Sequence, residues 1–338
     1  MRLSFASCST AAVQKRCTSA TITTTSHRRF CFSRYLSTSS SSSFSGDRQN
    51  FLLKIHKTAP KAAANKATRG GRNDDRIISC AWGDDVEFQK CTVRVKTNAT
   101  ERGDLYKICV DVDENFTKKF TAAGQYVQMK LAEKDKPAFI AIANGPANAR
   151  ERKMFEFLVK RPKEGYTDKE TGETVASTAQ KVCDLSVGEE EETKEVLVSE
   201  PMGKGFRVPE EGDIGEVLCF AAGSGISPVK SFLEEEGFDN NGAETFLFYG
   251  TRDAAHTAFA EELKTTMGGR AKVIHAYSAD GKGYAQDYFK RMVDSGELKL
   301  KDPKKAIAVL CGQKEMTEQT IEMLENEGVP RERILMNF

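Results

Sequence analysis

The stretch from Glu216 to Gly237 constrains the fold of this chain more than any other. Val217 to Ala222 is an apolar run without charges, as expected of a strand buried on both faces of a parallel sheet. It leads directly into Gly223-Ser224-Gly225, where the chain must turn. A helix should follow, with Ser227 as its N-cap and Pro228 at its first position. The stretch therefore predicts a strand, a glycine turn and a helix.

This turn suits a pyrophosphate group. Glycine lacks the Cβ atom that would hold a ligand away from the backbone, and a helix start offers unpaired N–H groups and a partial positive charge. However, GxGxxP is not the full GxGxxG dinucleotide fingerprint, and any strand-to-helix turn can carry glycine. The turn alone leaves a dinucleotide site and a plain turn open. The residues concerned are Gly223, Ser224, Gly225, Ile226, Ser227 and Pro228.

Charge divides the chain of 338 residues into a basic leader and an acidic body. Residues 1–73 contain 13 Lys and Arg but one acid, which leaves 37 basic and 48 acidic residues downstream. The leader is rich in Ser and Thr, the composition of an organelle transit peptide and linker, although a disordered basic tail is an alternative. Arg28-Arg29-Phe30 and Arg34 to Ser37 resemble mitochondrial processing sites, whereas the serine density resembles a plastid leader. The organelle, plastid or mitochondrion, stays open.

The composition of the body excludes several classes of function. An acidic body argues against nucleic acid as a partner, because phosphate neutralisation needs clustered Lys and Arg. No apolar run reaches the ~18 residues that a membrane span requires. The nine cysteines are scattered without a CxxC pair, and the four histidines have no metal-ligand spacing. We therefore expect neither an iron–sulfur cluster nor another metal site.

Residues 86–210 have the sequence pattern of a small antiparallel β-barrel. Short alternating segments are separated by turn residues, and six such strands make a barrel plausible. A single helix, about Ser177 to Leu185, should interrupt them, and the polar stretch Lys163 to Thr174 is interpreted as a surface insertion. The expected strands are Phe88–Lys96, Leu105–Val112, Tyr126–Leu131, Phe139–Ala143, Phe155–Val159 and Val196–Ser199.

Residues 214–338 alternate strand and helix, which predicts an α/β domain with a doubly wound parallel sheet. In such sheets ligands bind at the carboxyl ends of the strands. The strands are expected at Val217–Ala222, Thr245–Tyr249, Ala271–Tyr277, Ala306–Cys311 and Ile334–Phe338. The helices are expected from Pro228 and near Ala254–Thr266, Tyr284–Ser295 and Glu315–Glu327.

The order of these parts resembles the ferredoxin-NADP reductase superfamily, in which an FAD-binding barrel precedes an NAD(P)-binding domain. The motifs MGKGF, GSGISP, YG-x-R, LCGQK-x-M and the ending NF also resemble the plant "fruit protein" branch first named from kiwifruit. The similarity covers about Cys91 to Phe338. It implies that Gly223 to Pro228 form the pyrophosphate loop and that Thr251 and Arg252 approach the adenosine ribose. Further residues carried over are Ser278 after the third strand, and Cys311 and Gly312 beside the nicotinamide.

The flavin signature of the superfamily is altered in this chain. Its Arg-x-Tyr-Ser aligns with Ala138-Phe139-Ile140-Ala141, so Ala138 cannot supply the charge for the flavin phosphate and Ile140 offers only apolar contact. The second flavin motif, Gly-x-x-Ser, aligns with Ala176 to Ala179 and leaves hydroxyls at Ser177 and Thr178. The resemblance implies that FAD contacts Phe139, Ile140, Ala141, Ser177 and Thr178. Related reductases also place a terminal aromatic over the flavin, so Phe338 is predicted to be a stacking lid, with a plug of the core edge as the alternative.

These observations favour a flavin-dependent oxidoreductase that passes hydride from NAD(P)H to FAD and electrons to an unidentified acceptor. Cys311 and Phe338 are its expected catalytic residues. NADH and NADPH both stay open, because Arg252 could meet a 2′-phosphate that Asp253 would repel. An acidic ferredoxin is an unlikely acceptor for an acidic body. The alternatives are a non-catalytic nucleotide-binding module that has lost flavin and an electron-transfer subunit of a larger oxidoreductase.

Overall fold

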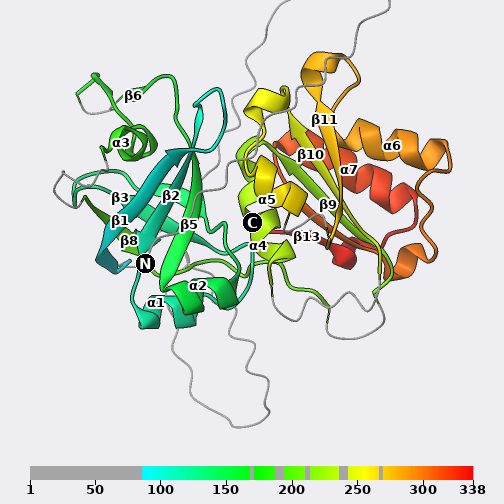
Figure 1. Cartoon of the computed structure of the whole chain (residues 1–338), viewed down its shortest axis with the longest axis horizontal. Coiled ribbons are helices and arrows are strands. Elements are labelled where there is room, and N and C mark those ends of the chain that lie inside the picture. The colour runs from blue at the N-terminus through cyan, green and yellow to red at the C-terminus, as the bar shows by residue number, and fades with distance from the viewer. Residues whose placement is uncertain are drawn as a thin grey trace, which may run out of the picture. The chain divides into compact units, whose positions relative to one another are not determined.

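The computed structural model describes residues 86–167, 171–186, 194–209, 214–235, 243–265 and 269–337, which all lie in one compact unit of the chain (Figure 1). The leader of residues 1–73 and the terminal Phe338 lie outside these described residues. The transit peptide, its organelle and the aromatic lid therefore stay predictions. Among the described residues, no helix has both the length and the apolar character needed to cross a bilayer.

The first half of the body is a nearly closed antiparallel barrel with the strand order β4-β3-β8-β1-β2-β5. A bridge between Ile142 and Phe157 joins the two ends of this order. The predicted barrel is confirmed, and its interior is filled by Val, Ile, Phe and Cys side chains that alternate along the strands. The strands are β1 (Phe88–Asn98), β2 (Leu105–Asp111), β3 (Tyr126–Lys130), β4 (Ala138–Ala141), β5 (Met154–Lys160) and β8 (Glu195–Ser199).

The expectation of a single helix in this half is wrong. Besides α3 (Thr178–Asp184), the structure has α1 (Glu114–Lys119) and α2 (Pro146–Arg152). Asp113 caps α1, since its Oδ1 accepts a hydrogen bond from the Phe116 N–H at 2.9 Å. Both helices are too short to show an apolar period, so only their caps signal them.

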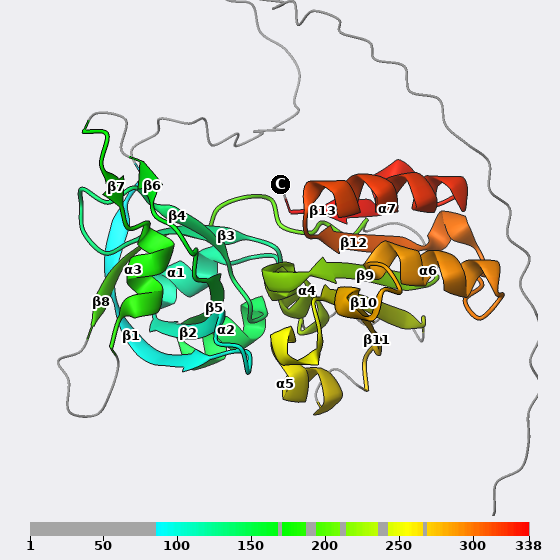
Figure 2. The same cartoon turned by 90° about the horizontal axis from the view of Figure 1, so that it is seen from above.

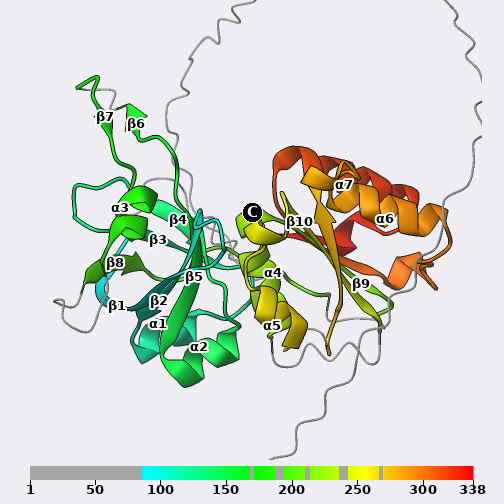
Figure 3. The same cartoon turned by 45° about the horizontal axis from the view of Figure 1, so that its top comes forward.

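The polar insertion of this half carries some regular structure of its own. Tyr166–Thr167 (β6) and Thr174–Val175 (β7) pair as a two-stranded antiparallel ribbon. Figures 2 and 3 show this ribbon projecting beyond α3, away from the strands of the barrel.

The second half is a parallel sheet with the order β11-β10-β9-β12-β13. Its central strand β9 is Val217–Ala222, with the bounds predicted from the charge-free run. Val217 and Cys219 pack into the core on one face, while Leu218 and Phe220 pack into the core on the other. The doubly wound sheet is thus confirmed. The other strands are β10 (Thr245–Thr251), β11 (Lys272–Tyr277), β12 (Ile307–Cys311) and β13 (Ile334–Met336).

The helices cover both faces of this sheet. Figure 1 shows α4 (Ile226–Leu233) and α5 (Ala260–Thr265) on the barrel side, and α6 (Ala285–Asp294) and α7 (Lys314–Asn326) on the far side. The helix predicted near Ala254–Thr266 is instead split into the 3-10 turn η2 (Ala254–His256) and α5. The chain breaks there because the Ala258 N–H donates to the Tyr249 hydroxyl and Phe259 takes a left-handed φ of 56°.

A buried ion network fastens α4 to the barrel. Lys230 of α4 lies 2.9 Å from Glu156 of β5, and both side chains are 4% exposed. Lys107 of β2 reaches Glu156 at 2.9 Å, and Lys230 also reaches Glu234 at 2.7 Å. Burial alone would raise the pKa of the Glu156 carboxyl, but the Lys230 and Lys107 ammonium groups outweigh it and lower that pKa. Because α4 begins at the glycine turn, the network also fixes that turn relative to the barrel.

Candidate cofactor-binding cavity

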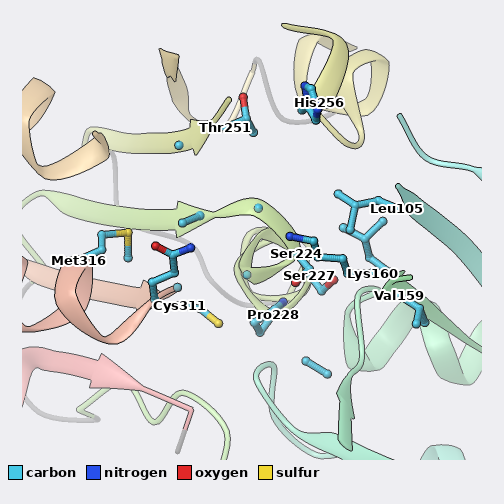
Figure 4. A pocket seen from close by; sticks show the side chains of 18 of the residues that line it. Leu105, Val159, Lys160, Ser224, Ser227, Pro228, Thr251, His256, Cys311 and Met316 are labelled. Carbon is cyan, nitrogen blue, oxygen red and sulfur yellow. The ribbon is translucent and has the colours of Figure 1, made fainter. Parts of the chain in front are cut away.

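A cavity of about 910 Å³ lies where the carboxyl edge of the parallel sheet faces the barrel. In Figure 4, Ser224, Ser227 and Pro228 lie at its centre, with Thr251 and His256 on one side and Cys311 and Met316 toward another. Barrel residues Leu105, Val159 and Lys160 line the wall beside them. The cavity therefore joins the predicted dinucleotide loop to the predicted flavin barrel in one continuous space.

The glycine loop differs in detail from the sequence prediction. Gly223–Gly225 form a 3-10 turn (η1), and α4 starts at Ile226 with Gly225 as its N-cap. Ser227 and Pro228 thus occupy the second and third helical positions, so the predicted capping role of Ser227 is wrong. Pro228 still costs no hydrogen bond, because the N–H groups of the first turn have no partner within the helix.

The two glycines of the loop have different functions. Gly223 has a φ of +54°, and a Cβ added to it would meet no heavy atom within 4 Å. A Cβ on Gly225 would lie 2.3 Å from the carbonyl oxygen of Cys311. Gly225 is therefore required for packing against the end of β12, whereas Gly223 keeps the cavity open in front of the backbone.

Unsatisfied polar groups gather in this cavity. The Ser227 hydroxyl, the side-chain carbonyl of Gln286 and both amide atoms of Asn337 are buried and have no hydrogen-bond partner among the described residues, and all three residues line the cavity. Asn337 is 4% exposed and follows β13, whose Met336 pairs with Leu310 just before Cys311. Buried polar groups in native proteins normally have hydrogen-bond partners. These unsatisfied side-chain atoms therefore indicate a ligand with complementary hydrogen-bonding groups.

Cys311 lines the cavity at the end of β12, as predicted. Burial raises the pKa of its thiol to about 12. At neutral pH it is therefore a protonated thiol and not a thiolate nucleophile. The neighbouring Gly312 also lines the cavity, so the pair forms a small, uncharged wall beside the loop.

The residues aligned with the flavin signature lie on β4, in the barrel wall of the cavity. Ile140, which also lines the cavity, is 7% exposed and belongs to the barrel core. Phe139 is 54% exposed, and its ring centroid lies 6.0 Å from that of Tyr126. Sequence alignment places Ile140 at the position of the flavin-stacking tyrosine, but the aromatic surface at this strand comes from Phe139.

Most of the predicted residues meet at this cavity, but three described ones do not. Ile226 is fully buried in the core below the loop. Ser177 caps α3 by accepting from the Gln180 N–H at 3.2 Å, and the Thr178 hydroxyl donates to the Lys136 carbonyl at 2.6 Å. Neither hydroxyl residue lines the cavity. The predicted residues that do are Phe139, Ile140, Ala141, Gly223, Ser224, Gly225, Ser227, Pro228, Thr251, Arg252, Ser278, Cys311 and Gly312.

Sequence reasoning missed several polar lining residues. Tyr284 is the N-cap of α6, Gln286 lies in α6, Gln319 lies in α7, and His256 comes from η2. The sequence predicted these helices only as elements that pack on the faces of the sheet. No local sequence motif marks their residues as part of a binding site. Tyr284 could have been found from its position, because it begins the helix that follows a strand at the carboxyl edge of the sheet, where ligands bind.

The comparisons with known proteins agree with this architecture. Residues 220–322 match the family model described as the oxidoreductase NAD-binding domain. Fruit protein pKIWI502 from Actinidia deliciosa is 27% identical over 249 residues, which cover 69% of this chain and 71% of that protein.

Solved structures show the same fold at low sequence identity. A mutant of ferredoxin-NADP+ reductase from Plasmodium falciparum is 15% identical with a TM-score of 0.57, covering 74% of this chain and 95% of that one. A ferredoxin NADP+ reductase from Neisseria gonorrhoeae with bound FAD and NADP is 15% identical with a TM-score of 0.57, covering 75% and 98%. The domain match, the curated relative and the shared two-domain architecture together show that this chain is similar to proteins of the ferredoxin-NADP reductase type and has their fold.

Proposed function

We propose that this protein is a flavin-dependent NAD(P)H oxidoreductase. The observation that carries the proposal is the continuous cavity between the glycine loop and the barrel wall. A nicotinamide dinucleotide held at the loop and a flavin held at the barrel would bring their rings together there. FAD, when bound, supplies the redox chemistry by accepting a hydride equivalent from the nicotinamide and passing electrons to an acceptor.

The residues of the sheet edge fit a dinucleotide. Gly223 leaves open space in front of the backbone, and the first turn of α4 offers N–H groups together with the Ser227 hydroxyl, which has no partner in the described part of the chain. Beyond the loop, the Asn337 amide has a donor and an acceptor that bond to none of the residues the structure describes. A carboxamide such as that of nicotinamide presents the complementary pair.

The barrel wall fits a flavin ring, with a changed set of contacts. Ala138, Phe139, Ile140, Ala141 and Val159 make an apolar surface along β4 and β5. Aromatic side chains are the usual stacking partners of a ring system, and Phe139 supplies one here. Ala138 brings no charge to a flavin phosphate, but Lys160 lines the same wall and is a cation that could do so.

The protein would contribute alignment and exclusion of water. The glycine loop and the Asn337 amide would orient the nicotinamide, and the apolar strand β4 would orient the flavin against it. Cys311 would keep its thiol proton and act as a neutral contact beside the reacting rings. The ion network between Lys230 and Glu156 would hold the loop at a fixed distance from the barrel.

One observation favours the alternative of a nucleotide-binding module without flavin. The two hydroxyls left from the second flavin motif make hydrogen bonds within the protein, since Ser177 accepts from the Gln180 N–H and Thr178 donates to the Lys136 carbonyl. A chain that had lost flavin would retain the loop of Gly223 to Pro228 and bind a dinucleotide alone. An experiment on the purified protein therefore decides between the two functions.

The test is the identity of the released cofactor. The protein is purified, denatured with acid, and the supernatant is separated by chromatography against FAD and FMN standards. The proposal predicts FAD at close to one molecule per chain. Protein that carries no flavin, and that takes up none on dialysis against excess FAD, would contradict it and support the nucleotide-binding module.

A further inference from the structure

We infer that Tyr249 is a positioning residue of the dinucleotide site. Its hydroxyl holds the carbonyl of Gly223 and thereby turns the N–H of Ser224 toward the cavity, where the pyrophosphate of a dinucleotide would accept a hydrogen bond from it. The inference rests on the proposed function, since it concerns the glycine loop of the same cavity. Gly223 and Ser224 line that cavity, whereas Tyr249 is fully buried and does not.

Tyr249 brings a hydroxyl into an apolar part of the core. It lies on β10 and belongs to the cluster of buried side chains on the α4 face of the sheet. A phenylalanine would fill nearly the same space and bury no polar group, so the hydroxyl needs partners that offset its loss of hydration. Burial raises the pKa of this hydroxyl, which therefore stays protonated and remains a hydrogen-bond donor. The partners of the hydroxyl indicate its function.

The hydroxyl has two backbone partners, and they fix which one receives its proton. The Ala258 nitrogen lies 3.3 Å from the hydroxyl oxygen, and the Gly223 carbonyl oxygen lies 3.2 Å from it. An amide N–H can only donate and a carbonyl oxygen can only accept, so the hydroxyl accepts from Ala258 and donates to Gly223. Tyr249 therefore joins the glycine loop to the segment between β10 and α5.

The bond to Gly223 also sets the direction of the next N–H. In a planar trans peptide the C=O and the N–H point in opposite directions. Because the Gly223 carbonyl is directed at the buried Tyr249 hydroxyl, the Ser224 N–H of the same peptide is directed away from it, toward the open space in front of Gly223. Ser224 lies in the first turn of η1, so its N–H has no partner inside that turn. This N–H is available to a phosphate oxygen.

The flexibility of glycine explains why the loop needs such a bond. Gly223 has a φ of +54°, and a residue without a Cβ can rotate its peptide at little steric cost. The Ile226 N–H also donates to the Gly223 carbonyl, but it does so from within the same turn. Among the described residues, Tyr249 is the one partner of this carbonyl outside the loop, so it ties the orientation of the loop to the rigid sheet.

The second bond of the hydroxyl has a purely structural effect. Ala258 precedes Phe259, whose ring centroid lies 5.1 Å from Lys230 Nζ and 5.6 Å from Lys107 Nζ in the buried ion network. Removing the hydroxyl leaves the Ala258 N–H without its partner as well, so some loss of stability is expected. Stability alone would not distinguish a positioning residue from a core residue, whereas nucleotide affinity does.

The test compares Tyr249→Phe with wild type in the intact purified protein. Calorimetric titration with NAD+ and with NADP+ gives the dissociation constants. Tyr249→Phe should weaken the more tightly bound of the two about fivefold, the effect of losing one hydrogen bond of ordinary strength. With the corresponding reduced nucleotide and ferricyanide as acceptor, KM should rise by a similar factor while kcat stays the same, since the Ser224 N–H would contact the pyrophosphate and not the reacting ring.

Ser231→Ala is the matched control. Ser231 is fully buried on α4, its hydroxyl donates to the Asn144 carbonyl at 2.8 Å, and it does not line the cavity. This variant also removes one buried hydroxyl, so its melting temperature should fall as that of Tyr249→Phe does, but its nucleotide affinity should equal that of wild type. If both variants lose affinity equally, or if neither loses any, the positioning role of Tyr249 is overturned.

A measurement on wild type covers the case in which Tyr249→Phe does not fold. The amide signal of Ser224 is followed by nuclear magnetic resonance in protein with isotope-labelled serine, and it is identified as the signal missing from Ser224→Ala. It should move downfield on saturation with ADP, which carries the pyrophosphate of both dinucleotides. A Ser224 signal that stays in place while ADP binds would overturn the positioning role and leave the proposed function intact. Binding of neither NAD+ nor NADP+ to wild type would overturn the proposed function itself.

Discussion

Replacing Glu156 by alanine is expected to cost about 3 kcal/mol in free energy of unfolding, because it leaves a buried lysine without its partner. Lys230 and Glu156 are 2.9 Å apart and nearly inaccessible to solvent. The expected loss is at the lower end of the range for broken buried pairs, since Lys230 keeps Glu234 at 2.7 Å. Denaturant titration of the variant and of wild type measures the difference.

The network offers a matched control and a rescue. Glu262 holds the outer end of the same network, where it meets Lys107 at 2.8 Å with its side chain 39% exposed. Glu262→Ala should therefore cost less than about 1 kcal/mol. The double variant Glu156→Leu/Lys230→Met should regain much of the stability that Glu156→Ala loses. A loss at Glu156 no larger than that at Glu262 would show that the network does not hold α4 on the barrel.

Gly225→Ala is expected mainly to lose stability, whereas Gly223→Ala is expected mainly to lose affinity for the dinucleotide. The added Cβ at Gly225 would lie 2.3 Å from a backbone oxygen of Cys311, so we expect a stability loss of about 3 kcal/mol, the upper range for overpacking. At Gly223 the Cβ meets open space and the cost is that of a left-handed φ, about 1–2 kcal/mol. The same Cβ would stand where the proposed function places a pyrophosphate, so dinucleotide affinity should fall at least tenfold, or ~1.4 kcal/mol.

Melting curves and nucleotide titrations of the two variants, run in parallel, check this separation. Gly225→Ala should show the larger fall in melting temperature. Gly223→Ala should remain folded at room temperature and show weakened binding of NADP+. If Gly223→Ala binds NADP+ as tightly as wild type does, the loop is only a turn. If Gly225→Ala is as stable as wild type, the Gly225 backbone does not lie as close to the Cys311 carbonyl as the structure places it.

The sequence predicted those parts of the fold that depend on a local pattern. The charge-free run Val217 to Ala222 marks a strand covered on both faces, and the structure places its alternate residues in two separate cores. The alternation along the six barrel strands was equally clear, and their bounds differ from the prediction by no more than two residues. In the parallel-sheet half, the order of strands and helices was also predicted correctly, and this order places the cavity at the carboxyl edge of the sheet.

Features that depend on contacts between distant residues could not be predicted in the same way. Ser227 and Pro228 carry good signals for a helix start, but the close approach of Gly225 to Cys311 sets where the chain turns. The helix expected near Ala254–Thr266 breaks because a tyrosine of β10 takes the Ala258 N–H. Asp253 follows Arg252 in the sequence, and only the structure shows that its carboxylate belongs to His256.

The most direct test of the proposed function is the reduction of the bound flavin by nicotinamide nucleotide. The purified protein is made oxygen-free, mixed with one equivalent of NADPH, and followed through the visible absorption band of oxidised flavin. We predict that this band bleaches within seconds and returns on admitting air, with Gly223→Ala responding only at higher NADPH concentration. A flavin band that stays unchanged with both NADPH and NADH, in protein that binds these nucleotides, would contradict the assignment as an NAD(P)H oxidoreductase.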